Sequence, residues 1–140
     1  MNERRILIDT GPLVAVASRS DSFHQLCIET LGALSPPLFT CWPVLTEAAW
    51  LLRNQGAALD KLFEAFEAGL FEPLALDGAA IEPIARFMRR YRNVGAQLAD
   101  AALVYLADRE GIRTVFTLDR RDFSIYRLKR NLALKIIPGI

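Results

Sequence analysis

The fold is decided by a short stretch near the start of the chain, residues 5–12, which reads RILIDTGP. Its apolar half predicts a buried strand over residues 5–9, and Thr10 is expected to cap a helix with Pro12 in its first turn. A strand that leads directly into a helix is typical of units with parallel strands. Asp9 then lies at the end of the strand, where parallel-sheet proteins place their ligand sites.

The same alternation of strand and helix continues along the chain. Further strands are expected at 38–41, 114–117 and 134–137, whereas 70–76 is ambiguous because Pro73 interrupts it. Helices are expected from 21 or 22 to 34, from 43 to about 54, across 59–69, around 81–88, and from about 97 to 110, where Gly111 stops the last one. We therefore expect an α/β fold, a three-layer α/β/α sandwich with a short, mainly parallel central sheet. No repeat or linker divides residues 1–140, so we expect a single domain.

Charge is divided unevenly between the two parts of the chain. The 140 residues carry 17 basic and 16 acidic side chains, which gives a net charge of +1. Residues 1–85 hold 5 basic and 11 acidic residues, a balance of −6, and residues 86–140 hold 12 and 5, a balance of +7. The net charge excludes a uniformly basic surface, but it allows an acidic pocket beside a phosphate-contacting surface that includes Arg86 and Arg90.

Cysteine and histidine content excludes two kinds of site. Cys27 and Cys41 show no CxxC spacing, and His24 is the only histidine, so neither a disulfide framework nor a thiolate–imidazole zinc site is expected.

The longest uncharged stretch, 30–46, contains three prolines and is too polar to cross a membrane. We expect a cytoplasmic protein.

Four carboxylates do not fit the polar helix faces that carry most of the acids. Asp9 and Asp119 follow apolar strands, and Glu47 and Asp100 lie on apolar helix faces. Singly, each has an ordinary explanation: Asp9 as a helix cap, Asp119 as the start of a turn or short helix, and the other two as rim residues that reach water. Together they favour one shared site. No Arg or Lys lies within four residues of Glu47 or Asp100, so the simplest compensating charge is Mg²⁺ or Mn²⁺, which prefer carboxylate oxygens.

Four blocks of sequence resemble the PIN-domain nucleases, and among them the VapC-like toxins of bacterial toxin–antitoxin pairs. The blocks are Ile6–Ala15, Thr40–Ala48, Leu98–Val104 and Thr117–Phe123, in this order and spacing. The resemblance implies a PIN-like fold and a Mg²⁺- or Mn²⁺-dependent endoribonuclease that hydrolyses RNA phosphodiester bonds.

The resemblance also implies roles for individual residues. Asp9, Glu47, Asp100 and Asp119 match the acidic quartet that holds the metal and is catalytic, and Asp122 is a candidate for assisting it. Thr10 and Thr117 match hydroxyl positions near the quartet, and packing or capping explains these two residues nearly as well. Arg120 and Arg121, beside Asp119, are the expected phosphate contacts, so these four are the predicted substrate-binding residues.

Partners are implied in the same way. The resemblance implies a homodimer and a cognate VapB-like antitoxin that crosses an apolar groove and inhibits the toxin. The candidate groove residues are Leu13, Trp42, Trp50 and Leu51. Ordinary core packing is the alternative for all four and the favoured explanation for Leu13 and Leu51, whereas Trp42, beside Pro43, is the better groove candidate.

Two other classes of protein remain as alternatives. One is a different Mg²⁺-dependent α/β phosphotransfer protein, either a receiver or a haloacid-dehalogenase-like phosphatase. The phosphatase needs an Asp two residues after Asp9, where this chain has Gly11, and the receiver needs a lysine after a late strand, which neither Lys129 nor Lys135 provides. The second alternative is a catalytically inactive PIN-fold binding module, which the intact quartet disfavours.

Overall fold

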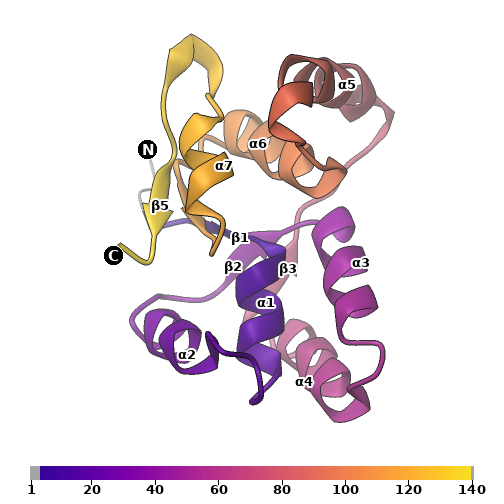
Figure 1. Ribbon diagram of the computed structural model, residues 1–140, viewed down its shortest axis with the longest axis vertical. Coiled ribbons are helices and arrows are strands. Elements are labelled where there is room, and N and C mark those ends of the chain that lie inside the picture. The colour runs from indigo at the N-terminus through magenta and orange to yellow at the C-terminus, as the bar shows by residue number, and fades with distance from the viewer. Residues whose placement is uncertain (1–3, 140) are drawn as a thin grey trace.

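A five-stranded parallel sheet forms the centre of the structure, a computed structural model that describes residues 4–139 (Figure 1). The strands are β1 (Ile6–Ile8), β2 (Leu38–Thr40), β3 (Phe71–Pro73), β4 (Thr114–Phe116) and β5 (Lys135–Ile137), in the order β3-β2-β1-β4-β5. Every neighbouring pair is parallel. The ambiguous stretch 70–76 therefore contains a strand, and Pro73 is tolerated there because β3 lies at an edge, where one side needs no ladder hydrogen bonds.

Helices cover both faces of the sheet. They are α1 (Thr10–Ala17), α2 (His24–Gly32), α3 (Trp42–Leu51), α4 (Gly56–Glu67), α5 (Ile81–Arg90), α6 (Leu98–Glu110) and α7 (Arg120–Ile125). The single-turn 3₁₀ helices are η1 (Gly78–Ala80), η2 (Arg92–Val94) and η3 (Lys129–Asn131). In Figure 1, α1–α4 lie on one side of the sheet and α5–α7 on the other. This division follows from right-handed crossovers, because the chain first moves from β1 out to β3 and then returns past β1 to β4 and β5. The expected three-layer α/β/α sandwich is confirmed.

The core packs against both faces of the central strands. All three residues of β1 are buried, as expected for a strand covered on two sides. On the face of the sheet opposite α1–α4, seven of the thirteen residues of α6 are buried. Four of these seven are alanines, which allow close packing. Gly111 ends α6 with a left-handed φ of 69°, and its N–H donates to Ala107 O, as the sequence predicts.

The first helix begins one residue away from the expected cap. Asp9, not Thr10, occupies the N-cap position of α1, and Thr10 is the first helical residue. The side chain of Asp9 makes no capping hydrogen bond, so the ordinary explanation of this carboxylate as a helix cap does not apply. The prediction for Thr10 was wrong because Asp and Thr are both good cap residues, and the local sequence does not distinguish them.

The strand order places a topological switch point between β1 and β4. After β1 the chain turns towards β2, and after β4 it turns towards β5, so the two connections leave a crevice between them at the carboxyl ends of the strands. The N–H of Asp9 donates to Phe116 O at 2.9 Å, which holds these two strand ends together. A ligand site is therefore expected where Asp9 and the residues after Phe116 lie.

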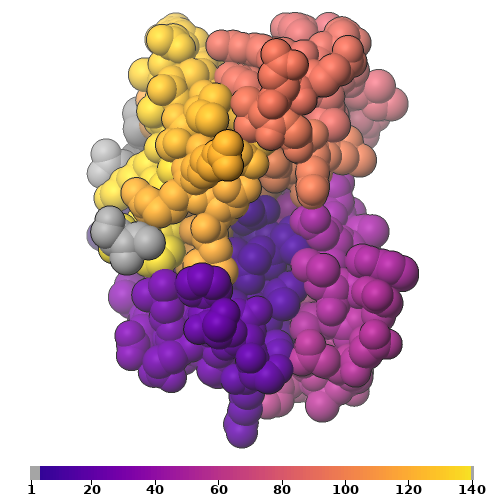
Figure 2. Space-filling view, viewed as in Figure 1, coloured from indigo at the N-terminus to yellow at the C-terminus, as the bar shows by residue number. Residues whose placement is uncertain are grey.

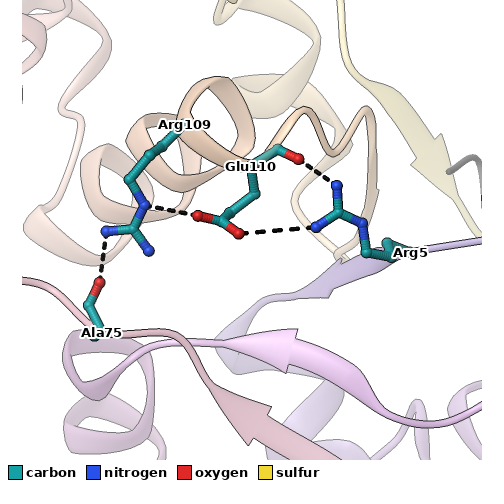
Figure 3. A network of polar contacts seen from close by, with 4 residues as sticks. All are labelled: Arg5, Ala75, Arg109 and Glu110. Carbon is teal, nitrogen blue, oxygen red and sulfur yellow. Dashed lines mark hydrogen bonds and ion pairs between the residues drawn. The ribbon is translucent and has the colours of Figure 1, made fainter. Parts of the chain in front are cut away.

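A polar network ties α6 to two distant segments (Figure 3). Arg109 Nε contacts Glu110 Oε2 at 2.8 Å, and Arg109 Nη1 donates to Ala75 O at 2.7 Å, in the segment after β3. Arg5, just before β1, donates to the backbone carbonyl of Glu110 and lies 3.8 Å from its carboxylate. The network therefore fixes the carboxyl end of α6, the helix that carries Asp100 in its first turn.

None of the helices within residues 4–139 is long and apolar enough to span a bilayer.

Candidate active site

Four segments of the chain bring their acidic side chains to one pocket at the carboxyl edge of the sheet. Asp9 follows β1, Glu47 lies on α3, Asp100 on the first turn of α6, and Asp119 at the N-cap of α7. All four line a single pocket of about 480 Å³, together with Asp122. In Figure 2 the face of the molecule is hollowed near its centre, where indigo atoms from the start of the chain lie deep between orange and magenta atoms. The structure thus brings the four predicted acids together.

Asp9 is the most deeply buried acid of this acidic pocket, with 6% of its surface exposed. Its Oδ2 accepts a hydrogen bond of 2.8 Å from the hydroxyl of Thr117. Its Oδ1 is buried and has no hydrogen-bond partner within the described residues. Burial, together with repulsion from Asp100 and Glu47, raises the pKa of Asp9 from 3.8 to about 7. The carboxylate therefore lacks a compensating group that its position requires.

Thr117 links the ends of β1 and β4 through its hydroxyl. The hydroxyl donates to Asp9 and accepts a hydrogen bond of 3.0 Å from the N–H of Asp119. Thr117 has no exposed surface, so its side chain orients Asp9 but cannot touch a substrate. The residue was predicted to bind substrate, and the structure gives it a positioning role instead.

Asp100 is held by a side chain that sequence analysis missed. The hydroxyl of Tyr126 donates to Asp100 Oδ2 at 2.7 Å, and the N–H of Gln97 approaches the same oxygen at 3.4 Å as part of a capping box. Burial raises the pKa of Asp100 in spite of these hydrogen bonds. Tyr126 is fully buried and packs edge-on against Phe123. The i, i+3 spacing of these two aromatic residues was a signal that both face inward, but nothing local indicated the bond to Asp100.

The remaining acids are more open to solvent. The side chain of Glu47 makes no hydrogen bond or ion pair with any residue of the 4–139 range. Asp119 caps α7 by accepting a hydrogen bond of 3.1 Å from the N–H of Asp122, so its ordinary explanation as the start of a short helix also holds. Burial and the neighbouring Asp119 raise the pKa of Asp122. Five acids thus share one pocket, and within the described part of the chain none of them forms an ion pair with Lys or Arg.

The donor chemistry of the acidic pocket fits a hard divalent cation. As the side chains stand, no three or more of the His, Cys, Asp and Glu residues in 4–139 form a group that could hold a metal ion, so the carboxylates would have to draw together around one. The charged residues that line the pocket are all carboxylates, and the other polar side chains there are Thr10 and Gln97. The buried Oδ1 of Asp9 has no hydrogen-bond partner among the described residues. Oxygen ligands suit Mg²⁺ or Mn²⁺ and disfavour softer metals.

The other predicted substrate-binding residues lie in different environments. Thr10 lines the acidic pocket but is only 5% exposed, and its Oγ1 is buried without a partner among the described residues. Arg120 turns away towards β5, where Nη1 donates to Pro138 O at 2.8 Å. Arg121 is exposed and makes no side-chain hydrogen bond or ion pair within residues 4–139. Only Arg121 is therefore free to meet a phosphate beside the pocket.

The predicted groove residues divide into one core residue and three exposed ones. Leu13 is fully buried, as its favoured explanation as core predicts, whereas the same explanation for Leu51 was wrong. Trp42, Trp50 and Leu51 on α3 are 63%, 62% and 51% exposed, and Leu51 also lines the acidic pocket. Exposed apolar residues of this size on one helix are typical of a surface that contacts another molecule.

Comparison with known proteins gives three findings. The family model of the PIN domain matches residues 6–130. Ribonuclease VapC26 of Mycobacterium tuberculosis (strain H37Rv) is 34% identical over 136 residues, which cover 95% of this chain and 100% of that protein. The crystal structure of M. tuberculosis VapC20, a Sarcin-Ricin loop cleaving toxin, matches with a TM-score of 0.75 and 17% identity, and covers 83% of this chain and 91% of that one.

Proposed function

The chain belongs to the PIN-domain family, and on that premise we propose that it is a Mg²⁺- or Mn²⁺-dependent endoribonuclease, the toxin of a toxin–antitoxin pair. The observation that carries the proposal is the acidic pocket, in which Asp9 keeps a buried oxygen without a partner while Glu47, Asp100 and Asp119 line the same space. The similarity to Ribonuclease VapC26 along nearly the whole chain supports RNA as the substrate.

In this proposal the four acids hold the cation, and their neighbours hold the acids. When bound, the ion supplies Lewis-acid activation of water and neutralises charge on the phosphodiester. Thr117 fixes the rotamer of Asp9 from the end of β4, and Tyr126 fixes that of Asp100 from the end of α7. These two hydrogen bonds limit the motion of the deepest carboxylates, which is what an ordered metal site requires.

Hydrolysis adds water to phosphorus and breaks the bond to the leaving oxygen, and no histidine of this chain is placed to take part. His24 lies on α2, with Nδ1 2.7 Å from Ala15 O. No lysine or histidine lines the acidic pocket. Arg121, beside Asp119, is the side chain that we assign to the phosphate next to the scissile bond, and Arg120 instead supports the turn after β5.

We also propose that partners use the exposed face of α3. Trp42 and Trp50 lie eight residues apart on this helix and are both more than half exposed. Because Leu51 lies on the same helix and lines the acidic pocket, a peptide bound along α3 would obstruct the site. A VapB-like antitoxin is the expected occupant, and a homodimer the expected state of the toxin.

The test uses purified wild-type chain and the Asp9→Asn variant, with cellular RNA as substrate and either Mn²⁺ or EDTA in the buffer. We expect discrete cuts only for the wild type in Mn²⁺. Asp60→Asn, an exposed substitution on α4, is the control of equal charge change and should cut like the wild type. Cleavage by Asp9→Asn equal to that of the wild type would contradict the proposal. Sequencing the new RNA ends identifies the target.

A further inference from the structure

A second pocket, of opposite charge, lies on the side of α6 that faces α5. It has a volume of about 430 Å³ and is bounded by α5, α6 and residues 127–129. In Figure 1, α5 and the segment after α7 stand on either side of α6. Its volume lies within the range of roughly 300–1,000 Å³ that is usual for pockets that bind small molecules. Five basic side chains line this basic pocket, against a single acid, Asp108.

Three of the five basic side chains already have partners. Arg86 pairs with Glu82, one turn earlier on α5. Arg109 belongs to the network with Glu110 and Ala75, and Arg127 donates to backbone carbonyls of residues 124–126. The charged ends of Arg90 and Lys129 make no hydrogen bond or ion pair with any part of residues 4–139. These two cations, on different walls of the basic pocket, are available to a ligand.

Aromatic rings form much of the remaining wall. Phe87, Tyr91 and Tyr105 line the basic pocket, and the guanidinium of Arg90 lies 5.0 Å from the centre of the Tyr91 ring. Cations interleaved with aromatic faces are typical of proteins that bind single-stranded nucleic acid, because cations meet phosphates and rings stack on bases. An acidic peptide offers carboxylates for the cations but no flat group for the rings, so the lining favours a nucleotide.

The basic pocket lies directly behind the acidic one. Tyr91 in its wall packs edge-on against Tyr126, with ring centres 5.0 Å apart, and the hydroxyl of Tyr126 contacts Asp100. The Tyr91 hydroxyl accepts the N–H of Arg127 at 3.0 Å, which fixes this wall. Two buried rings therefore connect the wall of the basic pocket to an acid of the other pocket.

We propose that the pocket between α5, α6 and residues 127–129 binds a nucleotide of single-stranded RNA outside the cleavage site, with Arg90 and Lys129 on its phosphates. The inference rests on the proposed ribonuclease function for the identity of the ligand. It adds a subsite that holds the strand independently of the metal. Binding there is expected to persist in EDTA, where cleavage is absent.

The first experiment measures binding of a short, fluorescein-labelled single-stranded RNA of mixed sequence to the full chain in EDTA at several salt concentrations. The double variant Arg90→Gln/Lys129→Gln is compared with Arg19→Gln/Lys61→Gln, which removes the same charge from exposed positions elsewhere. Each phosphate contact on a single strand contributes about 0.7 to the slope of log affinity against log salt. In Arg90→Gln/Lys129→Gln, the pocket variant, the magnitude of this slope should therefore fall by about 1.4, and the variant should bind RNA severalfold more weakly. The control should keep the wild-type slope.

Two outcomes overturn the inference: equal slopes for the two double variants, and absence of RNA binding by the wild type. A short polyglutamate peptide is the competing probe. If the peptide loses affinity in the pocket variant while RNA does not, the basic pocket binds an acidic peptide and the proposal is overturned. Photocrosslinking of RNA that carries 5-iodouracil should place the adduct on Tyr105 or a neighbouring ring, and an adduct confined to other parts of the chain also contradicts it.

Cleavage of the same RNA in Mn²⁺ separates the two proposals. If the wild type cuts the RNA and both double variants bind it with equal salt slopes, the proposed function stands and the subsite is overturned. If the wild type binds RNA through the basic pocket but never cuts it, the subsite stands and the proposed function is overturned.

Discussion

Replacing Asp9 by asparagine should make the metal-free protein more stable at neutral and alkaline pH, although it removes the central acid of the pocket. The reason is that the ionised carboxylate is buried with one oxygen unpartnered among the described residues. Burial is the main cause that raises its pKa from 3.8 to about 7. Since a tenfold change in proton affinity is worth about 1.4 kcal/mol, the ionised group destabilises the fold by roughly 4 kcal/mol.

Asparagine recovers only part of this free energy. Its Oδ1 can still accept the hydroxyl of Thr117, but its Nδ2 takes the place of an oxygen that has no hydrogen-bond partner among the described residues. A buried donor without a partner costs about 1–3 kcal/mol. The net expectation for Asp9→Asn is therefore a gain of about 1–3 kcal/mol in the free energy of unfolding above about pH 7.

The dependence on pH gives the prediction its sign. Between pH 3.8 and about 7 the folded state keeps a proton on Asp9 that the unfolded state has released, so the stability of the wild type falls as pH rises through this window and is level above it. Asp100 contributes in the same direction, because its pKa is also raised. In Asp9→Asn the fall should be smaller, since the contributions of Asp100 and Asp122 remain but that of Asp9 is removed.

The assay is urea unfolding in EDTA, followed by circular dichroism over a pH series from about 5 to about 8, which covers the upper part of this window and the level region above it. Circular dichroism is preferred to fluorescence because Trp42 and Trp50 are both exposed and report poorly on the core. Asp60→Asn controls for the charge change. Asp9→Asn should not unfold at a lower urea concentration than the wild type at about pH 8 if Asp9 destabilises the fold. A lower concentration, with an unchanged dependence of the unfolding free energy on urea concentration, would refute the expected stabilisation.

Two further predictions concern hydrogen bonds around α6. Tyr126→Phe keeps the buried ring but removes the donor to Asp100, so Mn²⁺ affinity measured by calorimetry should fall about 10- to 100-fold while the fold persists; unchanged affinity would show that Tyr126 does not position Asp100. Glu110→Gln weakens the contacts to Arg5 and Arg109, and because these side chains are about a third exposed, we expect a loss of no more than about 1 kcal/mol in urea unfolding. A loss several times larger would mean that the network of Figure 3 is needed for the fold itself.

Much of the fold could be predicted because it depends on patterns that are local in sequence. The strands β1, β2, β4 and β5 lie in short apolar runs, and turns or caps separate these runs from the neighbouring helices. The strand β3 remained ambiguous because Pro73 is disfavoured in a central strand and tolerated at an edge, and edge position is a property of the whole sheet. Asp9 and Asp100 were found because a carboxylate on an apolar face is unusual wherever it occurs.

What could not be predicted depends on contacts between distant residues. Tyr126 reaches Asp100 across 26 positions, and Arg120 turns to the carbonyl of Pro138 rather than to the acidic pocket. Thr117 was predicted only as a hydroxyl near the acids, and the pairing of β1 with β4 buries it completely. Propensity and periodicity describe a residue's own element, whereas these roles are set by which element packs against it.

The acidic pocket is assembled from positions 9, 47, 100 and 119, which are spread over most of the chain. The site is therefore incomplete while the chain is being synthesised, because β4 and the turn after it, which complete the pocket around Asp9, are made late in synthesis. Catalytic competence then begins only after nearly the whole domain has left the ribosome. A partner translated just ahead of this chain would have the duration of that synthesis to be present when the pocket closes.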